Sequence, residues 1–201
     1  MSCMQILVAA LCLVSLAVQG DAFSWPHWGR CQQLPVEQQF HLQLYLGVWY
    51  QQAGYNTESS KYNLRCVNTL YGLDSSNVVT VANNAIRNKD NRTQGINGTA
   101  EFADPSKDEG RLIVTFHPYS WLTVKGNYWI LGTDYSSYAV IYSCDNFLFF
   151  FHYYNVWFLS REQHFTAEQK RDYYNNTNTL LAVTGLASTP MQGVSQRNCY
   201  V

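Results

Sequence analysis

The sequence predicts an all-β fold: an eight-stranded, up-and-down antiparallel β-barrel with one C-terminal α-helix packed outside it. From Gly47 onward, short apolar or alternating runs recur at roughly regular spacing and are separated by turn residues, which is typical of barrels and sandwiches. The last run is apolar on both of its faces, and one segment after it carries the signals of a helix.

Eight segments fit the strand pattern, and they follow one another without an intervening helix. The expected strands are residues 48–53, 65–73, 78–86, 94–102, 111–116, 127–133, 138–144 and 147–160. The segment before them, residues 21–46, lacks strong periodicity and contains Pro26 and Pro35, so we expect an irregular N-terminal arm.

The run 147–160 indicates how the sheet closes. One face carries Tyr153 and Trp157 and the other carries Tyr154 and Phe158, so neither face suits open solvent. Because an antiparallel sheet usually leaves one face to water, both faces of this run must be covered. We expect the barrel interior on one side and the downstream helix on the other. The interior of an eight-stranded barrel has room for packed side chains or one small ligand.

A capping box formed by Thr166 and Gln169 predicts the start of the helix. The helix is expected over residues 167–174 and ends near the Asn-rich segment 175–178. Residues 182–185 can then add a short edge strand.

Composition and charge exclude several classes of protein. Apolar residues make up 47% of the 201 residues and charged residues 13%, which supports one domain with a sizeable core and argues against disorder. The net charge of -1 leaves no electrostatic footprint for nucleic acid.

The N-terminus has the pattern of a signal peptide. The apolar run 6–18 is too short to span a bilayer, which takes about 20 residues. Small residues follow it, so we expect a signal peptide over residues 1–20 and a single domain over residues 21–201. Cleavage after Ala22 and an uncleaved anchor are the alternatives.

Cysteines and sequons agree with secretion. Of six cysteines, Cys3 and Cys12 leave with the signal peptide, and an even number remains for two disulfides. Spacing alone allows three connectivities. A zinc site is the rival interpretation, but the chain has no Cys-x-x-Cys pair. The expected glycosylation sites are the three sequon residues Asn91, Asn97 and Asn175.

Three motifs occur in order along the chain: Gly47-Val48-Trp49-Tyr50, then Thr133-Asp134-Tyr135, and Arg161 just past the last expected strand. On these motifs the sequence resembles the lipocalin family. There the first motif opens the first strand, and the second lies on the turn between the sixth and seventh strands. The Arg lies over the Trp at the closed end. Residues 45–50, 128–135 and 138–144 resemble the apolipoprotein D-like branch, which is related to bilin-binding and crustacyanin-like lipocalins.

This resemblance implies a disulfide pattern and a set of pocket residues. It selects Cys31 with Cys144, which would pin the N-terminal arm, and Cys66 with Cys199, which would tether the C-terminal tail. Each disulfide typically contributes about 2–4 kcal/mol. The side chains expected to line the cavity are Tyr45, Tyr71, Asn83, Tyr128 and Trp157. The alternative is that these side chains simply fill the barrel.

Catalysis is not expected. One lipocalin branch is an isomerase with a free cysteine in its barrel, whereas all mature cysteines here are expected to form disulfides. The histidines form no ligand cluster by spacing, so no metal is expected. His152 lies on the face opposite Trp157 and is expected to point outward, which argues against haem. No cofactor is required beyond a bound lipophile or a bilin or carotenoid chromophore.

Two classes of function fit this pattern. The first is a secreted carrier that binds, transports or sequesters a fatty acid, steroid, retinoid, bilin or carotenoid in the barrel. The second is an extracellular interaction or inhibitor protein that uses the barrel as a scaffold. Phe116, Tyr119, Trp121 and Leu122 form a candidate patch for transient membrane or lipoprotein contact, or else a lid over the mouth. Homo-oligomerisation stays open.

Overall fold

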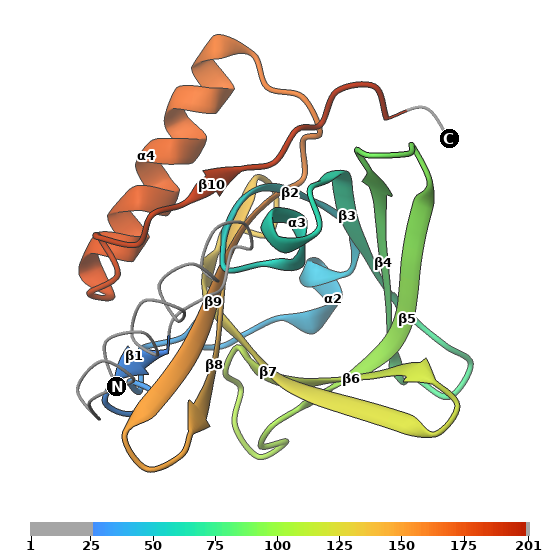
Figure 1. Ribbon diagram of the computed structural model, residues 1–201. Helices are drawn as coiled ribbons and strands as arrows, with labels where there is room; N and C mark the ends of the chain where they lie inside the picture. Colours follow the sequence, from blue (N-terminus) through green and yellow to red (C-terminus); the bar gives the residue numbers. More distant parts are fainter. Residues whose placement is uncertain (1–25, 200–201) are drawn as a thin grey trace, which may run out of the picture.

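A computed structural model describes residues 26–199, so the expected signal peptide lies outside the described residues. Eight successive strands form the barrel wall: β2 (Gly47–Tyr55), β3 (Leu64–Leu73), β4 (Val79–Arg87), β5 (Thr93–Phe102), β6 (Arg111–Tyr119), β7 (Leu122–Thr133), β8 (Tyr138–Phe147) and β9 (Phe151–Ser160). Each pairs antiparallel with the next, and β9 also pairs with β2. The expected closed, up-and-down barrel is therefore confirmed (Figure 1).

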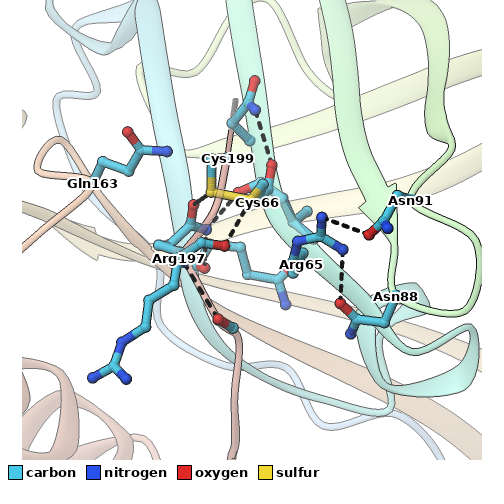
Figure 2. Close-up of a disulfide and its surroundings, with 12 residues drawn as sticks. Arg65, Cys66, Asn88, Asn91, Gln163, Arg197 and Cys199 are labelled. Atoms are coloured by element: carbon cyan, nitrogen blue, oxygen red, sulfur yellow. Dashed lines mark hydrogen bonds between the residues drawn. A yellow bond between two sulfur atoms is a disulfide. The ribbon is translucent and has the colours of Figure 1, made fainter. Parts of the chain in front are cut away.

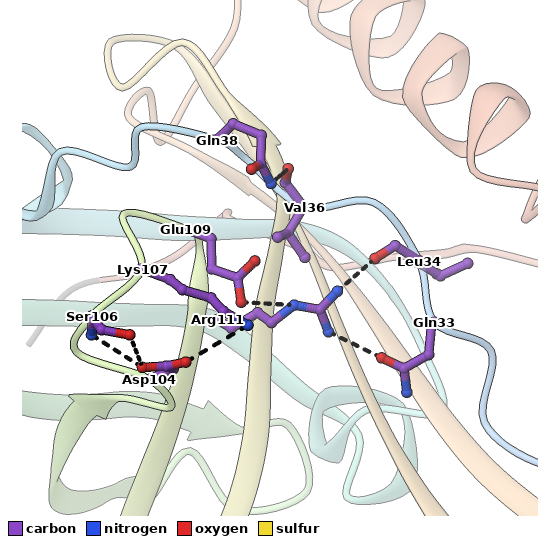
Figure 3. Close-up of polar contacts among 9 residues, drawn as sticks. All are labelled: Gln33, Leu34, Val36, Gln38, Asp104, Ser106, Lys107, Glu109 and Arg111. Atoms are coloured by element: carbon purple, nitrogen blue, oxygen red, sulfur yellow. Dashed lines mark hydrogen bonds and ion pairs between the residues drawn. The ribbon is translucent and has the colours of Figure 1, made fainter.

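The N-terminal arm is irregular, as expected, apart from the short strand β1 (His27–Trp28) and the short helix α2 (Leu42–Tyr45). β1 extends the sheet beside β9. Arg111 of β6 holds the middle of the arm, as Figure 3 shows. Its guanidinium donates to the Leu34 carbonyl oxygen at 3.0 Å, pairs with Glu109 at 3.3 Å and lies 4.1 Å from the centroid of the Trp129 ring.

Two apolar cores lie on opposite faces of the barrel wall. The inner core includes Trp49, Ile141 and Leu159, and the partly buried Trp157 packs against it. The outer core lies between the wall and the C-terminal helix. From β9, Val156 and Phe158 enter that outer core. The expected division of the last strand, with one face inside and one under the helix, is therefore confirmed.

The C-terminal helix α4 (Ala167–Val183) is longer than predicted. The capping box at Thr166 is present, but the helix continues through the Asn-rich segment where we expected it to end. The buried residues Tyr173, Thr177 and Leu181 explain the difference, because their spacing of four continues the face that packs on the barrel. Tertiary packing thus overrides the weak helix propensity of asparagine.

The end of α4 corrects a second expectation. Residues 182–185 do not form an edge strand. Gly185 has a φ of +78°. The Leu186 amide donates to the Leu181 carbonyl, and the Gly185 amide donates to that of Ala182, which is a Schellman motif. The strand that extends the sheet beside β2 is instead β10 (Gln192–Gly193).

The predicted strand 147–160 was wrong at its start. Phe147 ends β8, residues 148–150 form a turn, and β9 begins at Phe151. Because the turn consists of Leu148, Phe149 and Phe150, it lacks the Gly, Asn or Pro signals on which turn prediction depends. Strands β6 and β7 also extend further than predicted and meet at a tight tip.

The two disulfides join the terminal segments to the barrel. Cys31 of the arm is bonded to Cys144 of β8, and Cys66 of β3 is bonded to Cys199 of the C-terminal tail. This is the pairing that the lipocalin resemblance implies. Loops of 113 and 133 residues are closed by these bonds, so both restrict the unfolded chain strongly.

Candidate functional site

The end of the barrel where β2 begins and β9 ends is closed by Arg161 and Trp49. The guanidinium carbon of Arg161 lies 3.9 Å from the centroid of the Trp49 ring. The guanidinium donates hydrogen bonds of 2.9–3.0 Å to carbonyl oxygens of three segments, at Leu44, Val48 and Tyr135. One cation therefore joins α2, β2 and the turn between β7 and β8.

Gly47 and Asp134, which belong to the first and second motifs, shape the backbone at this end. Gly47 has a φ of +99°, and a Cβ added there would lie 3.2 Å from Arg161 Nη1. A side chain at this position would therefore be strained. Asp134 accepts hydrogen bonds from the backbone amides of Ser136, Ser137 and Tyr138. Although burial disfavours its charge, the hydrogen bonds to Asp134 hold the pKa of its carboxyl below the ordinary value.

Tyr45, Tyr71 and Tyr128, three of the expected pocket residues, meet at the floor of the barrel. The Tyr128 hydroxyl lies 2.9 Å from that of Tyr45 and accepts a hydrogen bond of 2.7 Å from Tyr71. Tyr45 and Tyr71 are fully buried, whereas Tyr128 keeps some accessible surface. Burial raises the pKa of all three hydroxyls, so the cluster stays neutral.

Asn83 and Trp157 lie higher on the inner wall. The Asn83 Oδ1 atom accepts a hydrogen bond of 2.7 Å from Thr69 Oγ1 on the neighbouring strand. Register places Asn83 on the same face of β4 as the buried residue Val81, which belongs to the inner core. Trp157 packs against that core from β9 and is half-buried. The structure thus brings all five expected residues to the inside of the barrel.

The inner wall above the tyrosine floor retains accessible surface. Val114, Phe116, Tyr128 and Trp157 pack against the inner core but are only half-buried. Gly126 shows the space directly, because a Cβ added there would meet a single atom within 4 Å, Val114 Cγ2 at 3.7 Å. The half-buried side chains and the open space at Gly126 together show that side chains do not fill this part of the inner wall.

Gln51, Thr57 and Ser59 form a buried polar cluster beneath the short helix α3 (Glu58–Lys61). Gln51 Nε2 donates to Ser59 Oγ at 3.0 Å and to Thr57 Oγ1 at 3.2 Å. Gly54 makes this possible, since a Cβ there would lie 2.5–2.6 Å from Gln51 Nε2 and Thr57 Oγ1. Sequence reasoning missed this cluster, because hydroxyl residues in a loop give no burial signal.

The open end carries exposed aromatic tips. Since the strands alternate in direction, the β6–β7 and β8–β9 turns project from the end opposite Arg161. Tyr119 and Trp121 are 61% and 78% exposed and stack with ring centroids 5.5 Å apart. Phe116, which we grouped with them, instead points into the barrel. On the other tip, Phe149 is 80% exposed.

Comparison with known proteins assigns the family. Residues 40–180 match the family described as lipocalin-like domain. The chain is a lipocalin. It is 32% identical over 170 residues to rat apolipoprotein D, with 84% of each chain covered. Lipocalins bind small hydrophobic ligands.

Solved structures share this lipocalin fold. Insecticyanin from the tobacco hornworm Manduca sexta has a TM-score of 0.72 at 23% identity, with 88% of this chain and 89% of that chain covered. Lobster apocrustacyanin A1 has a TM-score of 0.65 at 22% identity, with coverages of 84% and 91%. The expected resemblance to the apolipoprotein D-like branch and its crustacyanin relatives is confirmed.

Residues 26–199 of this lipocalin contain no cluster of three or more potential metal-ligating side chains. Within the same residues, no helix combines the length and apolar character needed to cross a bilayer. His152 lies outside the barrel, where its Nδ1 is 3.0 Å from the Gly29 carbonyl oxygen. This is the outward orientation that we expected.

Proposed function

We propose that this lipocalin is a secreted carrier that binds a small hydrophobic molecule in the barrel and transports or sequesters it. The half-buried inner wall around Gly126 carries the proposal, because it leaves accessible apolar surface on the inner face of the barrel. The domain would span residues 21–201 after removal of the signal peptide, and its disulfides suit an oxidising compartment.

The five expected pocket residues would have different roles in ligand binding. Tyr45 and Tyr71 are buried and form hydrogen bonds with Tyr128, so they would form a rigid floor. Trp157 and Tyr128 would supply aromatic contact. Asn83 would orient a polar end of the ligand. A fatty acid, steroid, retinoid, bilin or carotenoid fits this chemistry, and no catalytic step is required.

Purification from the natural source, followed by an absorption spectrum and mass spectrometry of an organic extract, tests this proposal. A visible band would identify a bilin or carotenoid, whereas a lipid at about one molecule per chain without colour would identify another lipophile. A colourless protein whose extract contains no lipophile, and which takes up none when supplied, would favour the scaffold function instead.

We further propose that the exposed tips at the open end contact a lipid surface during ligand uptake. Trp121, Tyr119 and Phe149 are large, exposed and located where a ligand would enter. Trp and Tyr suit the boundary between water and lipid, since their rings are amphipathic. Tyr119 and Trp121 stack on each other in the open, which favours contact over the alternative of a lid folded across the mouth.

A further inference from the structure

A polar hollow of about 670 Å³ lies on the outside of the molecule, between the β4–β5 turn and the C-terminal tail. Its lining consists of Arg65, Asn88, Asn91, Ser195, Arg197 and Asn198. The lining contains amides, a hydroxyl and guanidinium groups but no carboxylate. Such a surface does not suit a lipophile, but it offers the donors and acceptors that bind sugar hydroxyl and acetamido groups.

A disulfide and several hydrogen bonds hold the residues on both sides of the hollow in place. The Cys66–Cys199 disulfide and a hydrogen bond of 2.8 Å from the Cys66 amide to the Ser195 carbonyl oxygen hold the tail beside β3. On the other wall, Arg65 donates to Asn88 Oδ1 at 3.1 Å and to Asn91 Oδ1 at 2.9 Å (Figure 2). The Arg65 Nε atom is buried without a partner among the described residues.

Asn91 is the first residue of a sequon, and the hydrogen bond that holds its side chain does not involve the nitrogen that a glycan needs. Asn91 Oδ1 accepts this bond from Arg65, whereas an N-linked sugar attaches to Nδ2. Asn88 differs, because its Nδ2 already donates to Asn63 at 2.8 Å. The other sequon residues, Asn97 on β5 and Asn175 on α4, are exposed but do not line the hollow.

We propose that Asn91 carries an N-linked glycan whose first sugars lie in this hollow, between the Arg65 wall and the C-terminal tail. In the transfer, Asn91 Nδ2 forms a bond to C1 of the first sugar of a lipid-linked oligosaccharide. The bond from C1 to the lipid pyrophosphate breaks, the lipid pyrophosphate leaves, and the amide proton passes to a base of the transferring enzyme. The inference rests on the secreted state in the proposed function but not on the barrel ligand.

A free anion is the competing occupant, and the geometry disfavours it. Figure 2 shows the Arg197 guanidinium turned away from that of Arg65, so the two cations do not converge. Both terminal nitrogens of Arg65 already donate to asparagine amides. Nearby Asp90 pairs with Arg87 at 2.6 Å and with Arg92 at 3.6 Å, which leaves these arginines partly neutralised.

The first test measures site occupancy. The full chain is secreted from eukaryotic cells, as wild type and as Asn91→Gln, Asn97→Gln and Asn175→Gln, and glycopeptides are quantified by mass spectrometry. We expect occupancy at Asn91 and its specific loss in Asn91→Gln. A secreted, folded protein without sugar at Asn91 would overturn the proposal, whereas lipophile binding, measured on the same samples, would be unaffected by that result.

The second test measures whether the hollow shelters the glycan. Peptide-N-glycosidase F should release the Asn91 glycan about tenfold more slowly from the folded protein than from the denatured protein, since the first sugars would be held between Arg65 and the C-terminal tail. Arg65→Gln should keep the occupancy and abolish the delay. Equal release rates from folded and denatured wild type would overturn the proposal. So would saturable binding of inorganic sulfate that Asn91→Gln retains and Arg65→Gln loses.

Discussion

The Arg161 guanidinium covers the Trp49 indole at 3.9 Å, and the two residues join three segments of the closed end. Substituting Arg161 removes a cation–π contact and leaves several carbonyl oxygens without a hydrogen-bond donor. We expect Arg161→Ala to lower the free energy of unfolding by about 2–4 kcal/mol. Arg161→Lys should recover little of this, because an ammonium cannot reproduce the planar fork.

Urea denaturation measures this loss. Arg171→Ala is the matched control, because Arg171 is exposed on α4 and its substitution should change stability by less than about 0.5 kcal/mol. Equal midpoints for the Arg161 and Arg171 variants would contradict the structural role assigned to Arg161.

The Tyr128 hydroxyl bonds to both Tyr45 and Tyr71, so Tyr128→Phe leaves two buried hydroxyls without this partner. We expect a loss of about 1–3 kcal/mol in the free energy of unfolding. Tyr62→Phe, at a residue that is 62% exposed, serves as the control and should be nearly neutral. A stability of Tyr128→Phe equal to that of wild type would show that the hydroxyl cluster is not a rigid floor.

Much of the closed end was predictable, because its motifs are short and contiguous. Gly47, Trp49, Asp134 and Arg161 lie where the lipocalin resemblance implies. The errors arose where tertiary context decides local structure. The turn at 148–150 is made of apolar residues, and α4 continues through asparagines because Thr177 and Leu181 are buried. The cluster of Gln51, Thr57 and Ser59 depends on folding of a loop, which strand periodicity does not reveal.

His27 of β1 should make the attachment of this strand depend on pH. Its ring lies 5.4 Å from that of His152 and 4.7 Å from that of Tyr154, and its Nε2 atom is 3.0 Å from the Tyr55 hydroxyl. Burial, then repulsion from His152, lowers the pKa of His27 below 6.5. The folded state therefore binds this proton less readily than the unfolded state does. The contribution of His27 to the free energy of unfolding is therefore fully present above pH 6.5 and declines as the pH falls below that value.

Hydrogen exchange tests this dependence through the Gly29 amide, which bonds to the Phe150 carbonyl oxygen at 2.7 Å beside β1. We expect its protection factor to fall between about pH 7.5 and about pH 5.5 in wild type and to change little in His27→Gln. His164→Gln, an exposed control, should behave like wild type. The same fall in both variants would assign the effect to other groups.

The aromatic tips should govern contact with lipid surfaces. In flotation with neutral phosphatidylcholine liposomes, Trp121→Ala and Phe149→Ala should each reduce the bound fraction, and the double variant should reduce it further. Val183→Ala is the control, because Val183 is 72% exposed but lies at the end of α4. Unchanged flotation of the double variant would end this hypothesis.

The most direct test of the account is a ligand titration of a variant with a filled barrel. In Gly126→Phe the new ring enters the space beside Val114, whereas in Lys125→Phe it points outward from the adjacent residue. A fluorescent polyene fatty acid, with a steroid, a retinoid, a bilin and a carotenoid as competitors, reports binding. At least one of these ligands should bind wild type and Lys125→Phe with one site per chain. The same ligand should bind Gly126→Phe at least about tenfold more weakly, although circular dichroism shows that this variant is folded. Equal affinity for Gly126→Phe, or no binding of any probe by wild type, would contradict a carrier that holds its ligand inside the barrel.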